Sequence, residues 1–324
     1  MDLNTLFTEF KLKKALVIGD AMIDAYMWGE INRTSPEAPV SVVEIKKHEN
    51  RLGGAANVAL NLQSLGAKPI LCTVIGDDPK GVLFNTLMRN ANLSTKGILI
   101  SKERKTTLKT RVIANNKHQL RIDEEDTSYI EIEDQLLETI KEQVADIDII
   151  ILQDYNKGVL TPRIINEVIE IANTRKIPTI VDPKKANFLA YQNCTIFKPN
   201  LIEIKNGMNV NFNSNDIQEI ERVSSELRES LNAEGILLTL SERGICINTN
   251  NNFTHTPAFK TDVVDVSGAG DTVLAVASLC LTSNIDHTTL SRISSLAGGI
   301  TCEDIGVTPI NKEKLLLKAK KYII

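Results

Sequence analysis

A run of small residues that ends in an aspartate carries the clearest chemical signal in this sequence. Ser267-Gly268-Ala269-Gly270-Asp271 stands directly before residues 272–279, whose apolar spacing predicts a helix. A helix N-terminus presents unpaired N–H groups and a partial positive charge, which suits phosphate, so the run offers an anion hole at Gly268, Ala269 and Gly270. We expect Asp271 to stay ionised there and to accept the proton of a hydroxyl that attacks a phosphoryl group. Taken alone, an ordinary glycine turn is the simpler explanation.

A second glycine motif lies far earlier in the chain and favours the phosphotransferase hypothesis. Gly53-Gly54-Ala55-Ala56-Asn57 opens another stretch with helical spacing, residues 58–65, and Gly66 follows where a helix commonly ends. Two small-residue turns, each at the start of a predicted helix, are harder to attribute to chance than one. We expect the two turns to form opposite walls of one cleft.

The composition is typical of a globular protein with a small-molecule partner. With 324 residues and 42% hydrophobic content, the chain can bury a large core, and we expect residues 1–324 to form a single α/β domain. The formal net charge is -4, from 37 basic and 41 acidic residues, and no basic block is long enough to follow a nucleic-acid backbone. The charge pattern therefore argues against a nucleic-acid partner.

The cysteines and the first residues favour a cytoplasmic location. The five cysteines are scattered without a CxxC pair, so we expect neither a disulfide nor a zinc site and infer a reducing compartment. The sequence begins without a basic segment followed by an apolar one, and no apolar run approaches the ~20 residues that span a bilayer. We expect no membrane association.

Short apolar runs alternate with longer amphipathic ones along most of the chain. The short runs read as strands buried on both faces: residues 15–18, 69–75, 147–152, 179–181 and 236–240. Helical spacing covers residues 80–90, 132–145, 163–174 and 216–231. The alternation predicts a doubly wound α/β fold, in which a mainly parallel sheet is flanked by helices. Polar residues that follow the strands should gather at the carboxyl edge, where such sheets bind ligands: Asp20, Asp77, Asp154, Asp182 and Ser241.

Two regions break this rhythm. They lie at about residues 20–50 and 105–125, where β-branched residues partly alternate with charged ones, as in Lys109-Thr110-Arg111-Val112-Ile113. The pattern predicts a small antiparallel β lid beside the main sheet.

With both glycine motifs in view, the chain resembles the ribokinase-like (PfkB) carbohydrate kinases over nearly its whole length. The resemblance implies that Asp271 is the catalytic base and that the turn before it binds phosphate. It also implies that the first motif lies against the sugar, through Gly53, Gly54 and Asn57, with Asp24 binding sugar hydroxyls; from spacing alone, Asp24 is an ordinary solvated aspartate. No GxxxxGK[ST] motif occurs, which disfavours a P-loop kinase. In this family the lid covers the sugar and often forms a dimer contact, so we expect a homodimer through the lid sheet.

The nucleotide side is also assigned by resemblance. Lys198-Pro199-Asn200-Leu201-Ile202-Glu203 is similar to the family's N-x-x-E element, which implies that Lys198 contacts ATP and that Asn200 and Glu203 organise Mg²⁺, mainly through water. A helix cap, with Asn200 as N-cap and Glu203 three residues on, explains the same spacing. Ser241 and Gly244 match a turn along the nucleotide, and a simple β-turn explains them equally well.

Five further segments resemble the branch of the family that phosphorylates heptose 7-phosphate: residues 33–39, 106–111, 121–125, 154–158 and 181–184. This resemblance implies ATP-dependent phosphorylation of the anomeric hydroxyl of D-glycero-D-manno-heptose 7-phosphate to the 1,7-bisphosphate, for ADP-heptose and lipopolysaccharide core synthesis. Cations at predicted lid or strand-end positions could hold a substrate that already bears phosphate, with Asp182 beside them: Lys109, Arg111, Lys157 and Lys184.

The sequence departs from the branch pattern at two places, and three other functions remain as alternatives. Ser267 stands where threonine is usual, and Gly306-Val307-Thr308 replaces a Gly-Thr pair, which leaves a monovalent cation such as K⁺ unsettled. The four histidines are isolated and no HxGH motif occurs, so we expect adenylyl transfer to belong to another protein. The alternatives are a same-fold kinase for another sugar or sugar phosphate, a non-catalytic sugar-nucleotide sensor, and a metabolic scaffold.

Overall fold

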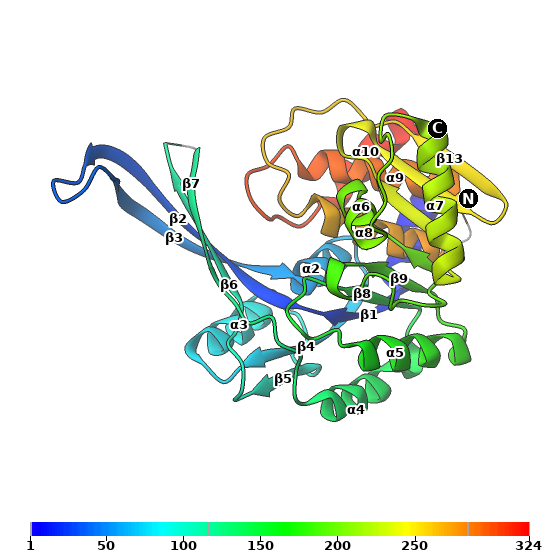
Figure 1. The fold of residues 1–324 in the computed structure, drawn as a ribbon, viewed down its shortest axis with the longest axis horizontal. Coiled ribbons are helices and arrows are strands. Elements are labelled where there is room, and N and C mark those ends of the chain that lie inside the picture. Colours follow the sequence, from blue (N-terminus) through cyan, green and yellow to red (C-terminus); the bar gives the residue numbers. More distant parts are fainter. Residues whose placement is uncertain (1, 116, 284, 324) are drawn as a thin grey trace.

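The computed structural model describes residues 2–115, 117–283 and 285–323. Within these residues the chain forms a body around a large sheet and an arm built from a smaller sheet (Figure 1). Figure 1 shows the arm, the predicted lid, projecting from one side of the body.

The larger sheet is mainly parallel, as the sequence predicts. Its strand order is β13-β12-β11-β10-β9-β8-β1-β4-β5, and every pair from β11 to β5 is parallel. The last two strands run antiparallel at the other edge. The strands are β1 Lys14–Gly19, β4 Lys68–Gly76, β5 Ile98–Ser101, β8 Ile149–Gln153, β9 Thr179–Asp182, β10 Ile196–Phe197, β11 Gly235–Thr239, β12 Ile245–Thr249 and β13 Asn252–Thr256.

Both faces of this sheet are buried, because consecutive side chains of a strand point to opposite sides. Ala15 and Val17 of β1 pack in one apolar core, and Leu16 and Ile18 pack in the other. The first core takes side chains from α1 Leu3–Glu9, α2 Ala55–Ser64, α3 Pro79–Asn90, α8 Ala269–Leu281, α9 His287–Thr301 and α10 Lys312–Tyr322. The second takes them from α4 Glu133–Gln143, α5 Pro162–Arg175, α6 Leu201–Gly207 and α7 Ile217–Leu231. The prediction of a doubly wound α/β fold is confirmed.

The helices that carry the glycine motifs begin earlier than their apolar spacing indicates. α2 starts at Ala55 and α8 at Ala269, so Asp271 is the third residue of α8. The residue before each helix is a glycine with positive φ, +59° at Gly54 and +78° at Gly268, which glycine adopts without strain. Each glycine motif therefore opens a helix, and the first turn of α2 is buried directly after the lid strand that precedes it, with the Ala55 N–H bonded to the Asp20 carbonyl oxygen at 2.9 Å.

The lid has the strand order β3-β2-β6-β7, formed by β2 Ala21–Thr34, β3 Ser41–Gly54, β6 Leu108–Ala114 and β7 Lys117–Glu124. The prediction of an antiparallel lid is wrong for one pair, since β2 and β6 are parallel. Both strands leave the body after a parallel strand, β2 after β1 and β6 after β5, and therefore run outward in the same direction. The strands β3 and β7 return beside them as hairpins.

Three aspartates stand where neighbouring parallel strands end. Asp20 follows β1, Asp154 follows β8, and Asp182 is the last residue of β9. All three are buried, and the lid strand β2 begins directly after Asp20. The carboxyl edge of the sheet thus meets the base of the lid. Among the described residues no helix is long and apolar enough to cross a membrane.

Candidate functional site

The two glycine motifs meet in direct contact. Asn57, in the first turn of α2, donates from Nδ2 to Oδ2 of Asp271 at 2.7 Å, although the two residues are far apart in sequence. A Cβ placed on Gly268 would lie 3.2 Å from the same Asn57 nitrogen, so the turn before α8 also approaches Asn57 closely. We expected the two turns on opposite walls of one cleft. The structure brings them closer than that, because a hydrogen bond joins the start of α2 to the start of α8.

Asp271 is a buried carboxylate held by three side-chain donors. Besides Asn57 on Oδ2, Oδ1 accepts the phenol O–H of Tyr155 at 2.7 Å and Nε2 of Gln153 at 3.3 Å. Burial raises the pKa of Asp271 to about 6, against the hydrogen bonds from Asn57 and Tyr155, which favour the charged form. Burial thus outweighs the helix N-terminus that we expected to dominate. A carboxylate of this pKa is ionised at neutral pH and can accept a proton.

Asp20 fixes the loop that carries Tyr155. Its carboxylate accepts three backbone N–H groups, from Tyr155 at 2.8 Å, Lys157 at 2.9 Å and Val159 at 3.0 Å. Burial raises the pKa of Asp20, and these three bonds act in the opposite direction. The guanidinium of Arg104 donates to the carbonyl oxygen of Lys157 from the other side. The loop is therefore held in place at several points.

Tyr155 and Gln153 are the site residues that sequence reasoning did not single out. Both lie in or beside the segment 154–158 that carries the heptose-kinase resemblance, yet only Lys157 was taken from it. Gln153 could have been found from the sequence, because it directly follows the predicted strand at 147–152, at the edge of the sheet where ligands bind. The contact of Tyr155 with Asp271 depends on long-range folding and has no local pattern.

The residues expected on the sugar side gather at the base of the lid. Asp24 of β2 is buried and forms an ion pair with Arg111 of β6. A Cβ on Gly53 would collide with the Asp24 carboxylate, so glycine is required for this close approach. The solvated Asp24 that spacing alone allowed is not what the structure has. Asp24, Gly53 and Arg111 form one cluster beside Gly54 and α2.

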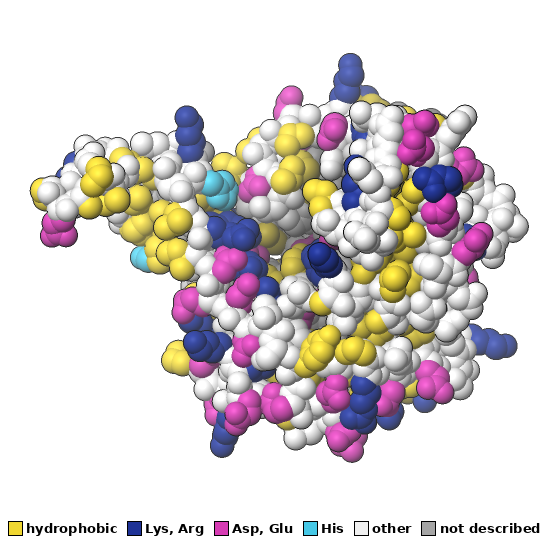
Figure 2. Space-filling model, viewed as in Figure 1, with side chains coloured by type: hydrophobic (Ala, Val, Ile, Leu, Met, Phe, Trp, Pro, Cys, Tyr) yellow, Lys and Arg dark blue, Asp and Glu magenta, His cyan; other side chains and the backbone are white. Residues whose placement is uncertain are grey.

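The four predicted cations divide into separate groups. Lys109 and Lys157 both pair with Glu125, at 2.8 Å each, and Lys109 also pairs with Asp123 at 2.9 Å. Arg111 pairs with Asp24, and Lys184 pairs with Glu203. Figure 2 shows a hollow between the lid and the body, with basic and acidic side chains on its walls. The site region is thus lined with paired charges of both signs.

Lys184 links the loop that carries Tyr155 to the start of α6. Its Nζ lies 5.6 Å from the centroid of the Tyr155 ring and bonds to a carboxylate oxygen of Glu203. Burial alone would lower the pKa of Lys184, but the carboxylates of Asp182 and Glu203 raise it well above its usual range. Lys184 therefore remains a full cation beside the ring of Tyr155.

The helix-cap interpretation of residues 198–203 is confirmed. Asn200 is the N-cap of α6, and Glu203 Oε2 accepts the Asn200 N–H while Asn200 Oδ1 accepts the Glu203 N–H. Lys198 is buried and pairs with Asp182 at 2.9 Å, and Asp182 also accepts from Gln153 at 3.4 Å. This chain of contacts connects the cap to Asp271 through Gln153.

The donor set around Asn200 fits Mg²⁺ held through water. Glu203 and Asn200 offer hard oxygen atoms, which Mg²⁺ prefers, but both oxygens of Glu203 already have protein partners. No group of three or more His, Cys, Asp or Glu with metal-binding geometry occurs among the described residues. Mg²⁺ usually keeps several waters and bridges substrate phosphates, so few direct protein ligands are needed.

Ser241 and Gly244 lie in a tight turn after β11. Ser241 opens the short 3-10 helix η4 (Ser241–Arg243) with φ +55°, and Gly244 has φ +95°. A Cβ on Gly244 would collide with the carbonyl oxygen of Thr256, so the turn needs a glycine there. The turn interpretation accounts for both residues.

The turn before α8 is supported by its own acidic residue. Asp265 Oδ1 accepts the backbone N–H of Ser267 at 3.0 Å and its hydroxyl at 2.8 Å, so serine supplies the hydroxyl that threonine usually provides. Oδ2 accepts the N–H of Gly306 at 2.8 Å. The loop at Gly306, where the sequence departs from the branch pattern, therefore packs against the anion-hole turn.

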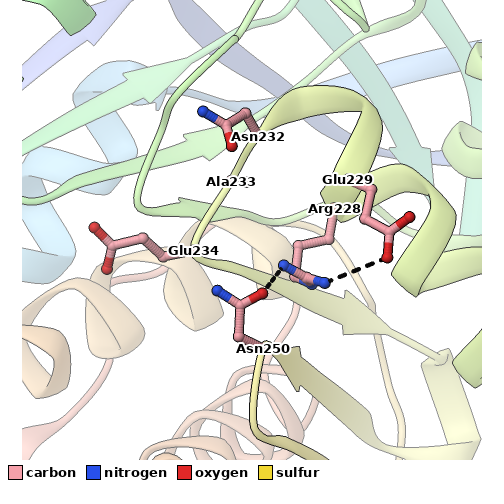
Figure 3. A pocket seen from close by; sticks show the side chains of 6 residues that line it. All are labelled: Arg228, Glu229, Asn232, Ala233, Glu234 and Asn250. Atoms are coloured by element: carbon pink, nitrogen blue, oxygen red, sulfur yellow. Dashed lines mark hydrogen bonds and ion pairs between the residues drawn. The ribbon is translucent and has the colours of Figure 1, made fainter.

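A second hollow lies away from these residues. It is about 570 Å³ in volume and lies at the carboxyl end of α7, as Figure 3 shows, lined by Arg228, Glu229, Asn232, Ala233, Glu234 and Asn250. Arg228 bonds to Asn250 across it. None of its lining residues contacts Asp271, and we do not assign it to the reaction.

Comparison with known proteins agrees with this geometry. Residues 12–314 match the model of the pfkB family carbohydrate kinases. Among curated relatives, the bifunctional protein HldE of Helicobacter pylori (strain G27) is 37% identical over 308 residues, 94% of this chain, and that of Geotalea uraniireducens is 35% identical over 318 residues, 97% of this chain. The chain spans 66% and 64% of the lengths of these two relatives.

Solved structures share the fold at low sequence identity. Phosphofructokinase-2 from Escherichia coli, solved in complex with potassium, has a TM-score of 0.80 at 18% identity and covers 96% of this chain and 99% of its own. Arabidopsis thaliana ribokinase, complexed with ribose and ATP, has a TM-score of 0.75 at 18% identity and covers 94% of this chain and 98% of its own. With the matched family model and the relatives above, these findings show that the chain belongs to the pfkB family of carbohydrate kinases and is an ATP-dependent sugar kinase of ribokinase-like fold.

Proposed function

We propose that this kinase phosphorylates the anomeric hydroxyl of D-glycero-D-manno-heptose 7-phosphate to give the 1,7-bisphosphate, a step toward ADP-heptose and lipopolysaccharide core. The observation that carries the proposal is the buried Asp271 carboxylate at the start of α8, in contact with Asn57 of α2, the helix that follows the lid strand β3. Relatives of the HldE type support the heptose substrate, as does the resemblance of the segments around Lys109, Lys157 and Lys184.

The reaction needs one proton acceptor and one phosphate cradle. The acceptor oxygen of the sugar forms the new bond to the γ-phosphorus while the bond from that phosphorus to the bridging oxygen breaks, and ADP leaves with the bond's electron pair. The acceptor proton passes to Asp271. We assign the stabilisation of the transferring phosphoryl group to the amides of Gly268, Ala269 and Gly270 at the N-terminus of α8, where the helix dipole favours an anion; the Ala269 N–H also donates to the Val266 carbonyl oxygen at 3.3 Å.

We assign ATP contacts to Lys198, Ser241 and Gly244. The ion pair of Lys198 with Asp182 supports this, since it places a cation at the carboxyl edge of the sheet. Asn200 and Glu203 would hold Mg²⁺ through water, and the ion would neutralise charge on the nucleotide phosphates. The potassium complex of the phosphofructokinase-2 neighbour supports testing K⁺, with Asp265 and the Gly306 loop as the region concerned.

The sugar's own phosphate is assigned to Lys109 and Lys157. Their side chains are only 14% and 12% exposed, and Glu125 now bridges them. A phosphate dianion can take the place of that carboxylate and bind both ammonium groups at once. We assign the contacts with the sugar ring to Asp24 and Asn57, with Gly53 and Gly54 beside them. The remaining residues assigned to the sugar-binding site are Arg111, Asp182 and Lys184.

We also propose that two copies of the chain form a homodimer through their lid sheets. Residues 1–324 would form a single kinase domain, and the protein would work in the cytoplasm. Leu120 and Ile122 lie two residues apart on β7, hence on one face, and are 59% and 46% exposed. Exposed apolar side chains on the edge strand of a sheet can be covered by another surface. A second copy of the chain would cover it, since the lid strands are the same in each.

Substitution of the base tests the proposed reaction directly. In the wild-type protein, mass spectrometry should identify a heptose 1,7-bisphosphate formed from ATP and heptose 7-phosphate. Asp271→Asn should lower kcat by about 10²- to 10⁴-fold with little change in ATP affinity, because the proton acceptor is lost and the anion hole is kept. Asp134→Asn, at a side chain that is 80% exposed on α4, is the control and should leave kcat unchanged. A wild-type protein that forms no bisphosphate, or an Asp271→Asn variant with full turnover, contradicts the proposal.

Removing one cation tests the phosphate assignment. Lys157→Ala should raise the KM for heptose 7-phosphate by about 10- to 100-fold, because a charge-assisted hydrogen bond to the phosphate is lost. The slow turnover of the unphosphorylated sugar should change little. Lys102→Ala, at an exposed lysine outside these ion pairs, serves as the control in the same steady-state assay. Equal losses with both sugars would show that Lys157 does not recognise the phosphate.

A charged residue on the lid face tests the dimer. Leu120→Asp should convert the protein to a monomer in sedimentation velocity runs, because it buries a carboxylate in the proposed apolar contact. Leu317→Asp changes a leucine of α10 that is 71% exposed, more than Leu120, and should leave the oligomeric state unaltered. A wild-type protein that sediments as a monomer at all concentrations rules the lid dimer out.

A further inference from the structure

The three donors to Asp271 are not distributed evenly over its two oxygens. Tyr155 and Gln153 both donate to Oδ1, while Asn57 is the one side-chain donor to Oδ2 among the described residues. A carboxylate offers about four lone-pair positions. The position left over is therefore on Oδ2, and Oδ1 is fully engaged by the protein.

The donor to Oδ1 at the shorter distance comes from a loop whose backbone is fixed. Tyr155 lies in the loop after β8, where its own N–H and those of Lys157 and Val159 end on the Asp20 carboxylate. The N–H of Asp154 donates to the carbonyl oxygen of Asp182 at 3.0 Å, which ties the start of the loop to β9. A phenol on such a loop keeps its position without help from a ligand.

From this geometry we propose that Tyr155 is a positioning residue for the catalytic base. Its hydroxyl anchors Oδ1 of Asp271, holds the carboxylate plane in one orientation and favours the ionised form, so that Oδ2 is free to accept the proton of the sugar hydroxyl. This inference deepens the proposed function and rests on the role of Asp271 in it.

The charged groups around Asp271 and Tyr155 come from several elements. None of them takes over the hydrogen bond that the Tyr155 phenol donates to Asp271. Asp182 on β9 disfavours ionisation of Asp271, and Lys198 after β10 favours it. Lys184 lies over the Tyr155 ring, and Asp24 of β2 also acts on the phenol. Burial and the neighbouring carboxylate of Asp271 raise the pKa of Tyr155 well above its usual range, so the phenol stays a donor at every working pH.

Replacing the hydroxyl should move the pH dependence of the reaction. The acid limb of kcat/KM for the wild-type protein should lie near pH 6, the pKa to which burial raises Asp271. Tyr155→Phe removes a hydrogen bond to the charged form and should shift that limb upward by about one pH unit, a threefold loss at about pH 6.5 that disappears at high pH. A loss that is equal at all pH values would indicate a merely structural role and would overturn the proposal. A gain in kcat/KM would also overturn the proposal. It is the result expected if the Tyr155 hydroxyl blocks Asp271 and the sugar has to displace that hydroxyl.

Tyr191 provides a matched control. Its buried phenol donates to Asp154 at 2.8 Å, an interaction of the same chemistry in the neighbouring position of the site. Tyr191→Phe should leave the acid limb where it is in the wild-type protein. A shift as large as that of Tyr155→Phe would attribute the effect to general loosening of the loop.

Two measurements keep the proposal testable if turnover or folding fails. NMR titration of ¹³C-labelled aspartate, with the Asp271 signal assigned from its loss in Asp271→Asn, reports the carboxyl pKa in the free protein and needs no substrate. The pKa should rise in Tyr155→Phe even if the heptose proves to be the wrong sugar, which separates this proposal from the proposed function. Incorporation of 3-fluorotyrosine at position 155 strengthens the donor without removing it and should lower the pKa; an unchanged pKa in both variants contradicts the proposal.

Discussion

The hydrogen bond between Asn57 and Asp271 is the contact on which the site depends. It joins the first turns of α2 and α8, whose preceding glycines adopt positive φ, so that two distant parts of the chain present their helix N-termini at one place. A buried carboxylate without donors would be costly. Asn57, Tyr155 and Gln153 satisfy it and still leave one lone-pair position. Burial then gives a carboxylate with a pKa of about 6, which suits a proton acceptor at neutral pH.

The parallel sheet explains why so many charges gather around this contact. Asp20, Asp154 and Asp182 stand at the ends of adjacent strands, and each is buried and satisfied by protein donors. The lid adds a second set of charges, in which Lys109 and Lys157 share Glu125. A site of paired charges can accept phosphorylated substrates by exchanging a carboxylate for a phosphate, with little change in net charge. In the proposed function, the lid would therefore contribute to substrate recognition as well as to cover.

Much of the fold could be predicted from the sequence, because apolar spacing reports burial directly. The runs at 15–18 and 69–75 lie in β1 and β4, the run at 236–240 lies in β11 apart from Leu240, and the helix expected at 163–174 is α5. The parallel pair in the lid was missed, since alternation shows that a strand exists but not its direction. Tyr155 and the shared Glu125 were missed as well, because their partners are set by long-range packing. The raised pKa of Asp271 could not be predicted for the same reason: local sequence indicates the helix end and an ionised carboxylate, whereas burial depends on the whole fold.

The central claim, that Asn57 and Asp271 act as one catalytic unit, is tested most directly by a double-mutant cycle on kcat at saturating sugar and ATP. Asn57→Ala and Asp271→Asn should each lower kcat. The double variant should be no slower than Asp271→Asn alone, within about twofold, because at saturating sugar Asn57 affects kcat through the carboxylate that the second substitution removes. Losses that multiply in the double variant would mean that the two residues work independently and would contradict this account.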